Sequence, residues 1–308
     1  MPDTPLGLYL HVPFCSRRCG YCAFVTYADA EVGDRDAHAR WAAAAQAEVA
    51  TADRVLGAGR PPLTSVYVGG GTPTAIRTPL LAQVLAEVRD RFATAPDLEV
   101  TVEANPDGLR PDQLHELRGL GVGRVSFGMQ SAVPRVLDLL DRTHDPDRVP
   151  EAVRDARDAG IAHVGLDLIY GTPGERPGDW TRSVDVALAP GVDHLSAYAL
   201  GVEAGTKLAA RVRRGELPDP SPDEAADRYD VVDARCEAAG LRWYELSNWA
   251  RTPAARCRHN LLTWRNHHWW GIGPGAHSHV GGVRWWNHAG LEAWGEPARA
   301  GRSPAAGH

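Results

Sequence analysis

The chain has 308 residues, of which 44% are hydrophobic and 23% charged, and its formal net charge is −6. This composition is typical of a globular protein, and the negative charge argues against a general nucleic-acid partner. No apolar run approaches the ~20 residues that cross a bilayer, and the first residues lack the basic and apolar regions of a signal peptide. We therefore expect a cytoplasmic protein without a transmembrane segment.

Short apolar segments alternate with helical patterns along most of the chain. Strands are predicted at 8–12, 65–68, 98–103, 122–127, 163–169 and 194–200. Helices are predicted between them, one from the apolar spacing of Leu81, Val84 and Val88 with Thr78 as its N-cap, and another opened by Asp145 and closed by Gly160. About six such units in series predict an α/β fold with a parallel barrel or open part-barrel.

Polar and glycine-rich segments follow the predicted strands. The three cysteines at 15–22 follow the first strand, a GGGTP segment at 69–73 the second, EANP at 103–106 the third and GMQS at 128–131 the fourth. In parallel barrels the carboxyl ends of the strands carry the functional loops, so this repetition predicts one ligand-facing rim. The GGGTP segment lacks the lysine of a P-loop, which argues against a nucleoside triphosphate.

The cysteine loop has the spacing C-x3-C-x2-C, with thiols at Cys15, Cys19 and Cys22. Thiolates suit iron–sulfur clusters and zinc, but a structural zinc site needs a fourth nearby ligand, and Phe24 stands two positions after the last cysteine. Three thiolates leave one iron of a [4Fe–4S] cubane open to a substrate. A fourth cysteine, Cys236, lies on the apolar stripe of a predicted helix that opens with Ser221, so we expect a core thiol.

The segment YLHVPF before the cysteine loop, with the loop itself, resembles the radical S-adenosylmethionine (SAM) family of oxygen-independent coproporphyrinogen III oxidases and their relatives. The resemblance covers residues 8–290, and Phe24 resembles the heme chaperone HemW branch, since the oxidases usually carry a further cysteine there. It implies a radical SAM (β/α)6 partial TIM barrel with a C-terminal extension, a [4Fe–4S] cluster on the three cysteines, and SAM chelated by the open iron. An electron from a reductant such as flavodoxin or ferredoxin then cleaves the S–C5′ bond of SAM.

The resemblance also implies which residues contact SAM. His11 has two interpretations that stay open here: it points toward the cluster, or it is a core histidine with satisfied hydrogen bonds. The implied SAM-binding residues are Tyr9, Gly70, Gly71, Thr72, Glu103, Gln130, Arg142, Asp167, Tyr198 and Gly201.

A segment rich in Trp, His and Gly, 243–286, is expected to form a separate module packed against the barrel. We divide the chain into a part-barrel core, 1–205, and an extension, 206–308. The sequence HNLLTW that begins at His259 resembles the HNxxYW signature of the HemW branch, with Thr263 in place of Tyr. Imidazole and thiolate both bind haem iron, so His259 and Cys257 are the haem-ligand candidates. A histidine that hydrogen-bonds a domain interface is the alternative for His259.

Three functions stay open at this point. The first is a HemW-like chaperone that binds haem and delivers it to respiratory proteins; Phe24 and the HNLLTW segment favour it, as does the short segment before Tyr9. The second is an oxygen-independent coproporphyrinogen III oxidase, and the third an electron-transfer or structural metal module. The family usually continues with a helical C-terminal domain, which we expect to be missing after His308.

Overall fold

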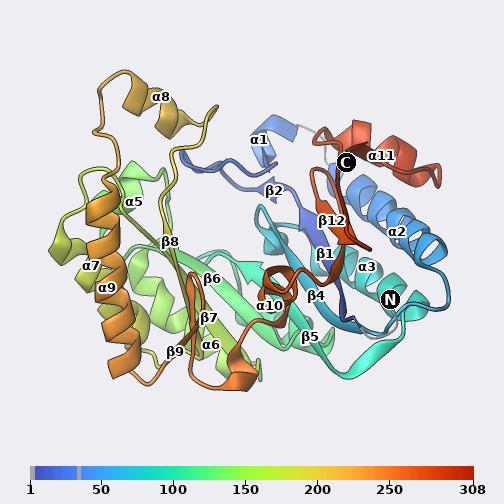
Figure 1. Cartoon of the computed structure of the whole chain (residues 1–308), viewed down its shortest axis with the longest axis horizontal. Helices are drawn as coiled ribbons and strands as arrows, with labels where there is room; N and C mark the ends of the chain where they lie inside the picture. Colours follow the sequence, from blue (N-terminus) through green and yellow to red (C-terminus); the bar gives the residue numbers. More distant parts are fainter. Residues whose placement is uncertain (1–3, 33–35) are drawn as a thin grey trace.

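The computed structural model describes residues 4–32 and 36–308 and contains one curved 12-stranded sheet and a separate two-stranded ribbon (Figure 1). The strand order of the large sheet is β14-β13-β12-β11-β1-β4-β5-β6-β7-β8-β10-β9. Seven consecutive strands, from β11 to β8, are parallel, and the outer strands are antiparallel. The fold is therefore an open α/β part-barrel, as expected.

Six parallel strands carry the predicted βα units. Their bounds are β1 Leu6–Val12, β4 Leu63–Gly70, β5 Thr94–Ala104, β6 Arg124–Gln130, β7 His163–Tyr170 and β8 His194–Ala199. The predicted fourth strand began two residues too early and the sixth ran one residue too far. Strands such as β1 and β7 are almost entirely buried, because parallel strands covered on both faces exclude water from both.

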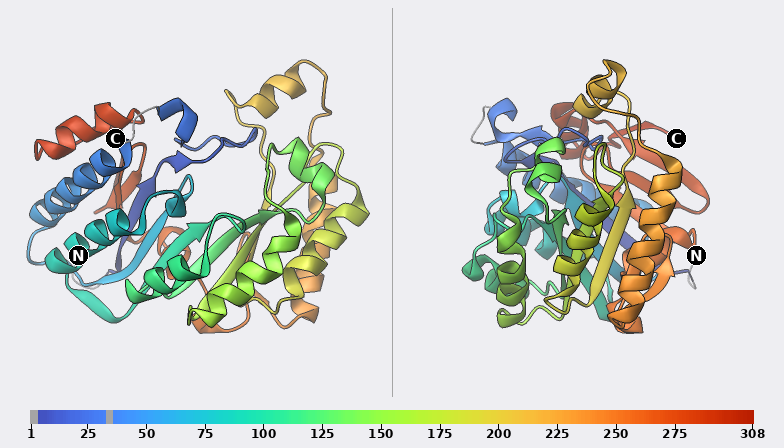
Figure 2. Two further views of the ribbon diagram at one scale, coloured as in Figure 1. Left: turned by 180° about the vertical axis from the view of Figure 1, so that it is seen from behind. Right: turned by 90° about the vertical axis from the view of Figure 1, so that its left-hand side faces the viewer.

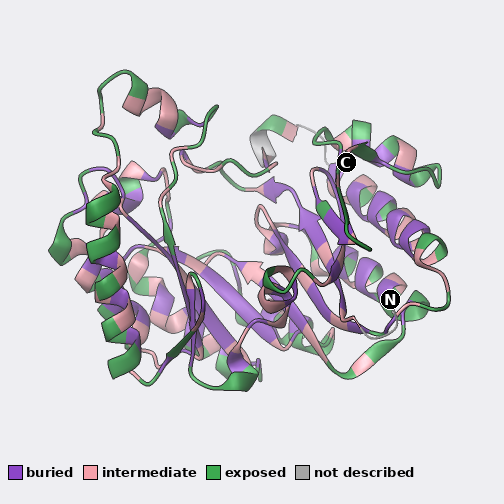
Figure 3. Cartoon of the chain, in the orientation of Figure 1, coloured by how far each residue is buried: buried purple, intermediate pink, exposed green. Residues whose placement is uncertain are grey.

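Helices cover the convex face of the sheet (Figure 2). The helices that follow the six strands are α2 Ala37–Leu56, α3 Thr78–Arg91, α4 Pro111–Gly119, α6 Val149–Asp158, α7 Pro177–Leu188 and α9 Pro222–Ala238. Shorter helices in the loops are α1 Asp29–Val32, α5 Pro134–Leu139 and α8 Lys207–Arg213, with 3₁₀ turns at Pro73–Ala75, Pro146–Arg148 and Pro253–Ala255. Each long helix turns an apolar stripe inward, so the buried core lies between the helices and the strands (Figure 3).

Two helix starts test the expected caps. Ser221 caps α9, since its hydroxyl accepts a hydrogen bond from the Glu224 backbone N–H, and Cys236 is fully buried as expected. Thr78, in contrast, is the first residue of α3; Arg77 is the N-cap, and no side chain satisfies the free backbone groups there. The proline at the second position explains the shift, because its missing N–H removes one of the donors that a cap would satisfy.

The extension joins the sheet at both edges. At one edge, β10 Asn248–Ala250 pairs with β8, and β9 Arg242–Glu245 pairs with β10. The chain then passes through α10 Arg258–Trp264 to the other edge. There it adds four strands beside β1: β11 His268–Ile272, β12 His277–Val280, β13 Val283–Asn287 and β14 Ala305–Gly307. Helix α11 Leu291–Arg299 packs on α2. The Trp/His-rich segment thus continues the sheet, where we expected a module packed against it. The domain boundary at residue 205 stays a prediction.

Candidate functional site

The cysteine loop is tied to the carboxyl end of β1 by backbone hydrogen bonds. Its first part, β2 Phe14–Cys15, pairs with β3 Tyr27–Ala28, so the loop leaves and returns at one place. The Gly20 N–H donates to the Leu140 carbonyl, and the Gly20 carbonyl accepts from the Leu208 N–H of α8. The loop is therefore held from two sides.

The glycines at the end of β4, Gly70 and Gly71, make room for the cysteine loop. Gly70 has φ +115°, and a Cβ there would lie 2.6 Å from the His11 ring. A Cβ on Gly71 would lie 2.6 Å from the Phe14 carbonyl oxygen and 2.9 Å from the Cys15 sulfur. A side chain at either position would push the two loops apart. The glycine pair therefore lets the end of β4 lie close to His11 and to the Cys15 thiol.

Of the two interpretations of His11 left open above, the structure supports the core histidine with satisfied hydrogen bonds. It is only 5% exposed, and its Nε2 donates to the Val25 carbonyl at 2.8 Å, which leaves Nδ1 to accept from the Tyr9 hydroxyl at 2.9 Å. Burial lowers its pKa to about 4, so the ring is neutral at pH 7. His11 is thus a satisfied buried histidine that also anchors the end of the cysteine loop.

Two side chains from neighbouring loops place donors near the sulfurs. The Thr72 hydroxyl lies 3.8 Å from the Cys15 sulfur, and the Arg142 guanidinium 3.7 Å from the Cys19 sulfur. Arg142 also donates to Asn105 and to the Gly128 carbonyl, while its Nε has no partner among the described residues. Such donors stabilise thiolates and thiolate-bound clusters.

Without metal, burial raises the pKa of the Cys15 thiol to about 11 and also raises that of Cys22, so these two thiols are protonated at pH 7. Iron has to displace those protons. Among residues 4–32 and 36–308, no three His, Cys, Asp or Glu side chains converge tightly enough for a single metal ion. A cubane presents its irons at separate corners, so three spread thiols suit it better than they suit one ion.

A cavity of about 490 Å³ opens beside the cysteine loop at the carboxyl ends of the strands. Small-molecule sites are commonly of this size. Eight of the ten predicted SAM-contacting residues line it: Gly70, Gly71, Glu103, Gln130, Arg142, Asp167, Tyr198 and Gly201. The other two, Tyr9 and Thr72, do not line the cavity. The Tyr9 hydroxyl hydrogen-bonds His11, and the Thr72 hydroxyl lies near the Cys15 sulfur.

Two of the three carboxylates in the cavity wall, Glu103 and Asp167, are held by hydroxyl groups; Glu203 is the third. Glu103 accepts from the Tyr67 hydroxyl at 2.6 Å and from the Gly70 N–H at 3.2 Å, and burial raises its pKa to about 7. Asp167 accepts from the Ser126 hydroxyl at 3.0 Å, and burial raises its pKa as well. Neither carboxylate pairs with a cation in the described chain, so both can accept from the donors of a ligand.

Backbone strain marks the same wall. Gln130 ends β6 with φ 62°, a left-handed conformation that is costly for a residue with a side chain. The register between β6 and β7 shifts between Gly128 and Gln130, which turns the Gln130 side chain toward the cavity. Strain of this kind concentrates at binding sites.

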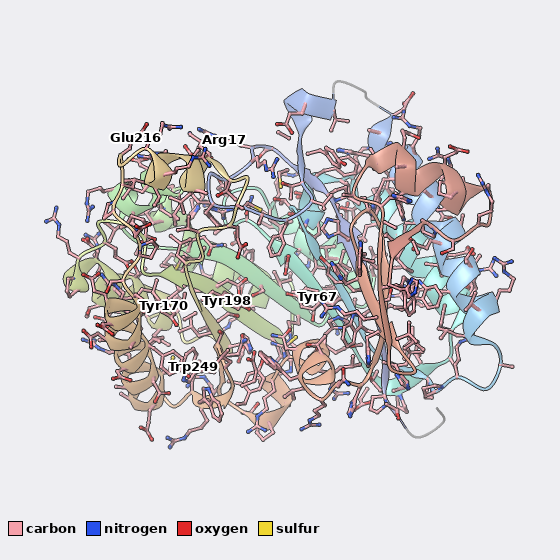
Figure 4. All side chains as sticks on the ribbon, turned by 45° about the horizontal axis from the view of Figure 1, so that its top comes forward. Arg17, Tyr67, Tyr170, Tyr198, Glu216 and Trp249 are labelled. Atoms are coloured by element: carbon pink, nitrogen blue, oxygen red, sulfur yellow. The ribbon has the colours of Figure 1, made fainter. Side chains whose placement is uncertain are left out.

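The predicted residues leave part of the cavity wall unassigned. Tyr67 donates to Glu103, and Asn105 accepts from Arg142, so both position predicted residues. Tyr67 comes from β4 and Tyr198 from the end of β8, and both lie toward the middle of the molecule in Figure 4. Inward-facing polar residues at alternate strand positions were the signal that could have found Tyr67.

The two haem-ligand candidates lie at the other end of the sheet, at the start of α10: Cys257 is its N-cap and His259 its second residue. His259 is 6% exposed; its Nδ1 lies 3.0 Å from the Ser65 hydroxyl, and its ring packs 5.3 Å from that of Tyr67. Cys257 is 3% exposed, beside Glu99 at 3.7 Å, and burial raises the pKa of its thiol. Both side chains are buried, so neither presents a ligand atom at the surface of this structure.

A buried ion pair holds α10 in this place. Glu99 pairs with Arg124 at 3.2 Å and accepts from the Arg258 N–H at 2.8 Å, at the start of the helix. Arg124 also donates to the carbonyls of Ala255 and Arg256. The carboxylate sits where a helix N-terminus stabilises negative charge.

Residues 9–187 match the family model described as the Radical SAM superfamily. The chain belongs to this superfamily. A [4Fe–4S] cluster and SAM are the cofactors that the superfamily implies, and the thiol loop, the glycine pair and the cavity wall have the donor chemistry that both require.

Among its radical SAM relatives, the chain is 52% identical to the heme chaperone HemW of Mycobacterium tuberculosis, over 100% of this chain and 78% of that protein. It is 33% identical to HemW of Bacillus subtilis, over 90% of this chain and 71% of that protein. The chain therefore belongs to the HemW family. The solved structure of coproporphyrinogen III oxidase from Escherichia coli superposes with a TM-score of 0.84 at 23% identity, covering 99% of this chain and 71% of that one, and supports the fold. No described helix is long and apolar enough to cross a membrane.

Proposed function

We propose that this chain is a HemW-type haem chaperone that uses a radical SAM site. The observation that carries the proposal is the 52% identity to a heme chaperone along the whole chain, together with a cavity that adjoins the cysteine loop. We assign Cys15, Cys19 and Cys22 as ligands of a [4Fe–4S] cluster. Thr72 and Arg142 would donate hydrogen bonds to the sulfurs.

SAM fits the cavity beside this loop. The Gly70 and Gly71 backbone admits a ligand close to the thiols, Glu103 and Asp167 accept hydrogen bonds from its hydroxyl or ammonium groups, and Arg142 can hold a carboxylate. When bound, the cluster supplies the electron that cleaves SAM. Tyr198 and Gly201, at the end of β8, would flank the adenine.

Haem would be the cargo, and respiratory proteins the recipients. A reductant such as flavodoxin or ferredoxin would supply the electron, and the cytoplasm would be the compartment. The HemW relatives are named heme chaperones, which supports haem as the cargo. Phe24, which is 67% exposed and lines the cavity, supports the chaperone over the oxidase, because an apolar ring cannot supply the further thiol of the oxidases.

One reconstituted sample can decide between chaperone and oxidase. The full chain, with cluster, SAM and reductant, is titrated with haem and assayed in parallel for the conversion of coproporphyrinogen to protoporphyrinogen. We expect a haem Soret band that saturates and no decarboxylation. Formation of protoporphyrinogen would overturn the chaperone assignment and support the oxidase.

A further inference from the structure

The strands added beside β1 present an exposed face that is separate from the cavity. Trp269 pairs with His279 across β11 and β12, and His277 pairs with Trp286 across β12 and β13. Arg284 pairs with His279. Directly opposed residues lie on the same face, and so do residues two apart on one strand. These five side chains form one surface, the outer His/Trp face, and none of them lines the cavity.

His277 is the accessible imidazole of this face. Its side chain is exposed, and no hydrogen bond to its ring occurs within the described residues. Partial burial and the charge of Arg284 lower its pKa, so the ring is neutral at pH 7 and keeps a free lone pair. His279 differs, since it is only 7% exposed, its Nδ1 bonds the His267 carbonyl at 2.9 Å, and its ring lies 5.0 Å from that of Trp269.

An aromatic ring and a cation flank His277. The Trp286 ring centroid is 5.9 Å from that of His277, and the indole is 40% exposed. Gly307 of β14 supports this ring, since a Cβ there would lie 2.5 Å from it. Arg284 is exposed, and it forms none of the ion pairs found in the described chain. Its guanidinium is thus available to an anion.

Haem requires this combination of groups. Its iron binds imidazole, its macrocycle packs on aromatic rings, and its two propionates pair with arginine. We propose that His277 binds haem iron on the outer His/Trp face, with Trp286 against the macrocycle and Arg284 on a propionate. The proposal rests on the proposed function and names where the cargo binds. An exposed site loads and releases haem without uncovering a buried side chain, which ligation by His259 or Cys257 would require.

The test is a titration of the full chain with haemin, followed at the Soret band. His277→Ala should weaken binding at least tenfold and change the band, and added imidazole should restore the spectrum. Arg284→Gln should weaken binding a few-fold. His288→Ala, at an exposed histidine just after β13, is the matched control and should bind like the unaltered chain, as should His259→Ala and Cys257→Ala.

The outcomes separate the site from the function. If the unaltered chain binds haem and His277→Ala binds it equally with the same spectrum, the site is wrong and the chaperone function stands. If His259→Ala alone removes binding, the ligand lies at the start of α10 and the site is likewise wrong. If the unaltered chain binds no haem, both proposals fail. Far-ultraviolet circular dichroism of each variant shows that a loss of binding is not a loss of folding.

Discussion

The two ends of one sheet use buried polar side chains in different ways. At the carboxyl end, Glu103 and Asp167 face a cavity and have no cationic partner in the described chain. At the amino end, Glu99 is closed under α10 with Arg124 as its partner. Carboxylates facing a cavity are available to a ligand, whereas a carboxylate paired beneath a helix holds that helix in place.

The difference bears on how short motifs are interpreted. The HNLLTW segment suggested a haem ligand, yet the structure places His259 at the closed end, beside Ser65 and Tyr67. Residue type alone does not distinguish a ligand from a buried hydrogen-bonding partner. In this structure His259 hydrogen-bonds Ser65, and the haem titration of His259→Ala tests it as a ligand.

The largest effect is expected at the open end. Replacing Cys15, Cys19 and Cys22 together by Ala should reduce the iron bound after anaerobic reconstitution from about four per chain to none. Iron analysis and the visible absorption of the cluster measure this. Cys236→Ala, at a buried thiol on α9, should keep its iron. Equal iron in the triple variant would refute the cluster assignment.

At the amino end of the sheet, where α10 covers Glu99, we expect a substitution to lower the free energy of unfolding. Glu99→Gln leaves Arg124 buried without a counter-charge, and breaking such a pair costs about 3–5 kcal/mol of unfolding free energy. Urea unfolding measures the loss, and SAM affinity of the folded variant should not change. Asp112→Asn, in an exposed ion pair with Arg110, should cost less than about 1 kcal/mol. A large loss of SAM affinity in Glu99→Gln would remove the distinction between the two ends.

A further buried carboxylate, Glu48, predicts a pH dependence of stability. Glu48 of α2 is buried, accepts from the Gly273 N–H and the side chains of Asn287 and Trp294, and has a pKa raised to about 7 by burial. The unfolded chain loses this proton near its ordinary pKa and the folded chain only near 7. Stability is therefore full at low pH, and it falls by about 3 kcal/mol between the ordinary pKa of about 4.5 and pH 7. Unfolding curves at pH 5 and pH 8 should show most of this fall, and Glu48→Gln should make it smaller; an equal slope in the variant would contradict it.

The smallest effect is expected for single cavity carboxylates. Glu103→Ala or Asp167→Ala should weaken SAM binding about tenfold or more, since a hydrogen bond to a charged ligand is worth ~1.5–3 kcal/mol. Equilibrium binding to the reconstituted protein measures it, and the iron content should stay unchanged. Unaltered affinity in both variants would show that the cavity does not hold SAM.

Much of this architecture could be predicted from the chain. The strand and helix patterns predicted six βα units, because a buried parallel strand and an amphipathic helix each leave a local signature. The rim was predictable because parallel strands end at one edge. Tyr67 was missed, since one inward-facing tyrosine in an apolar strand resembles core. The placement of β11 beside β1 was also missed, because a pairing across more than 250 residues leaves no local pattern.

That pairing has a consequence for how the chain folds during synthesis. β1 is completed by residue 12, yet one of its two parallel neighbours, β11, begins only at His268. Contacts of such sequence separation form late, because the loop that they close is long. While the ribosome is still translating the middle of the chain, the edge of β1 is an unpaired strand open to other chains. The nascent chain is therefore expected to need protection of this edge until its last strands emerge.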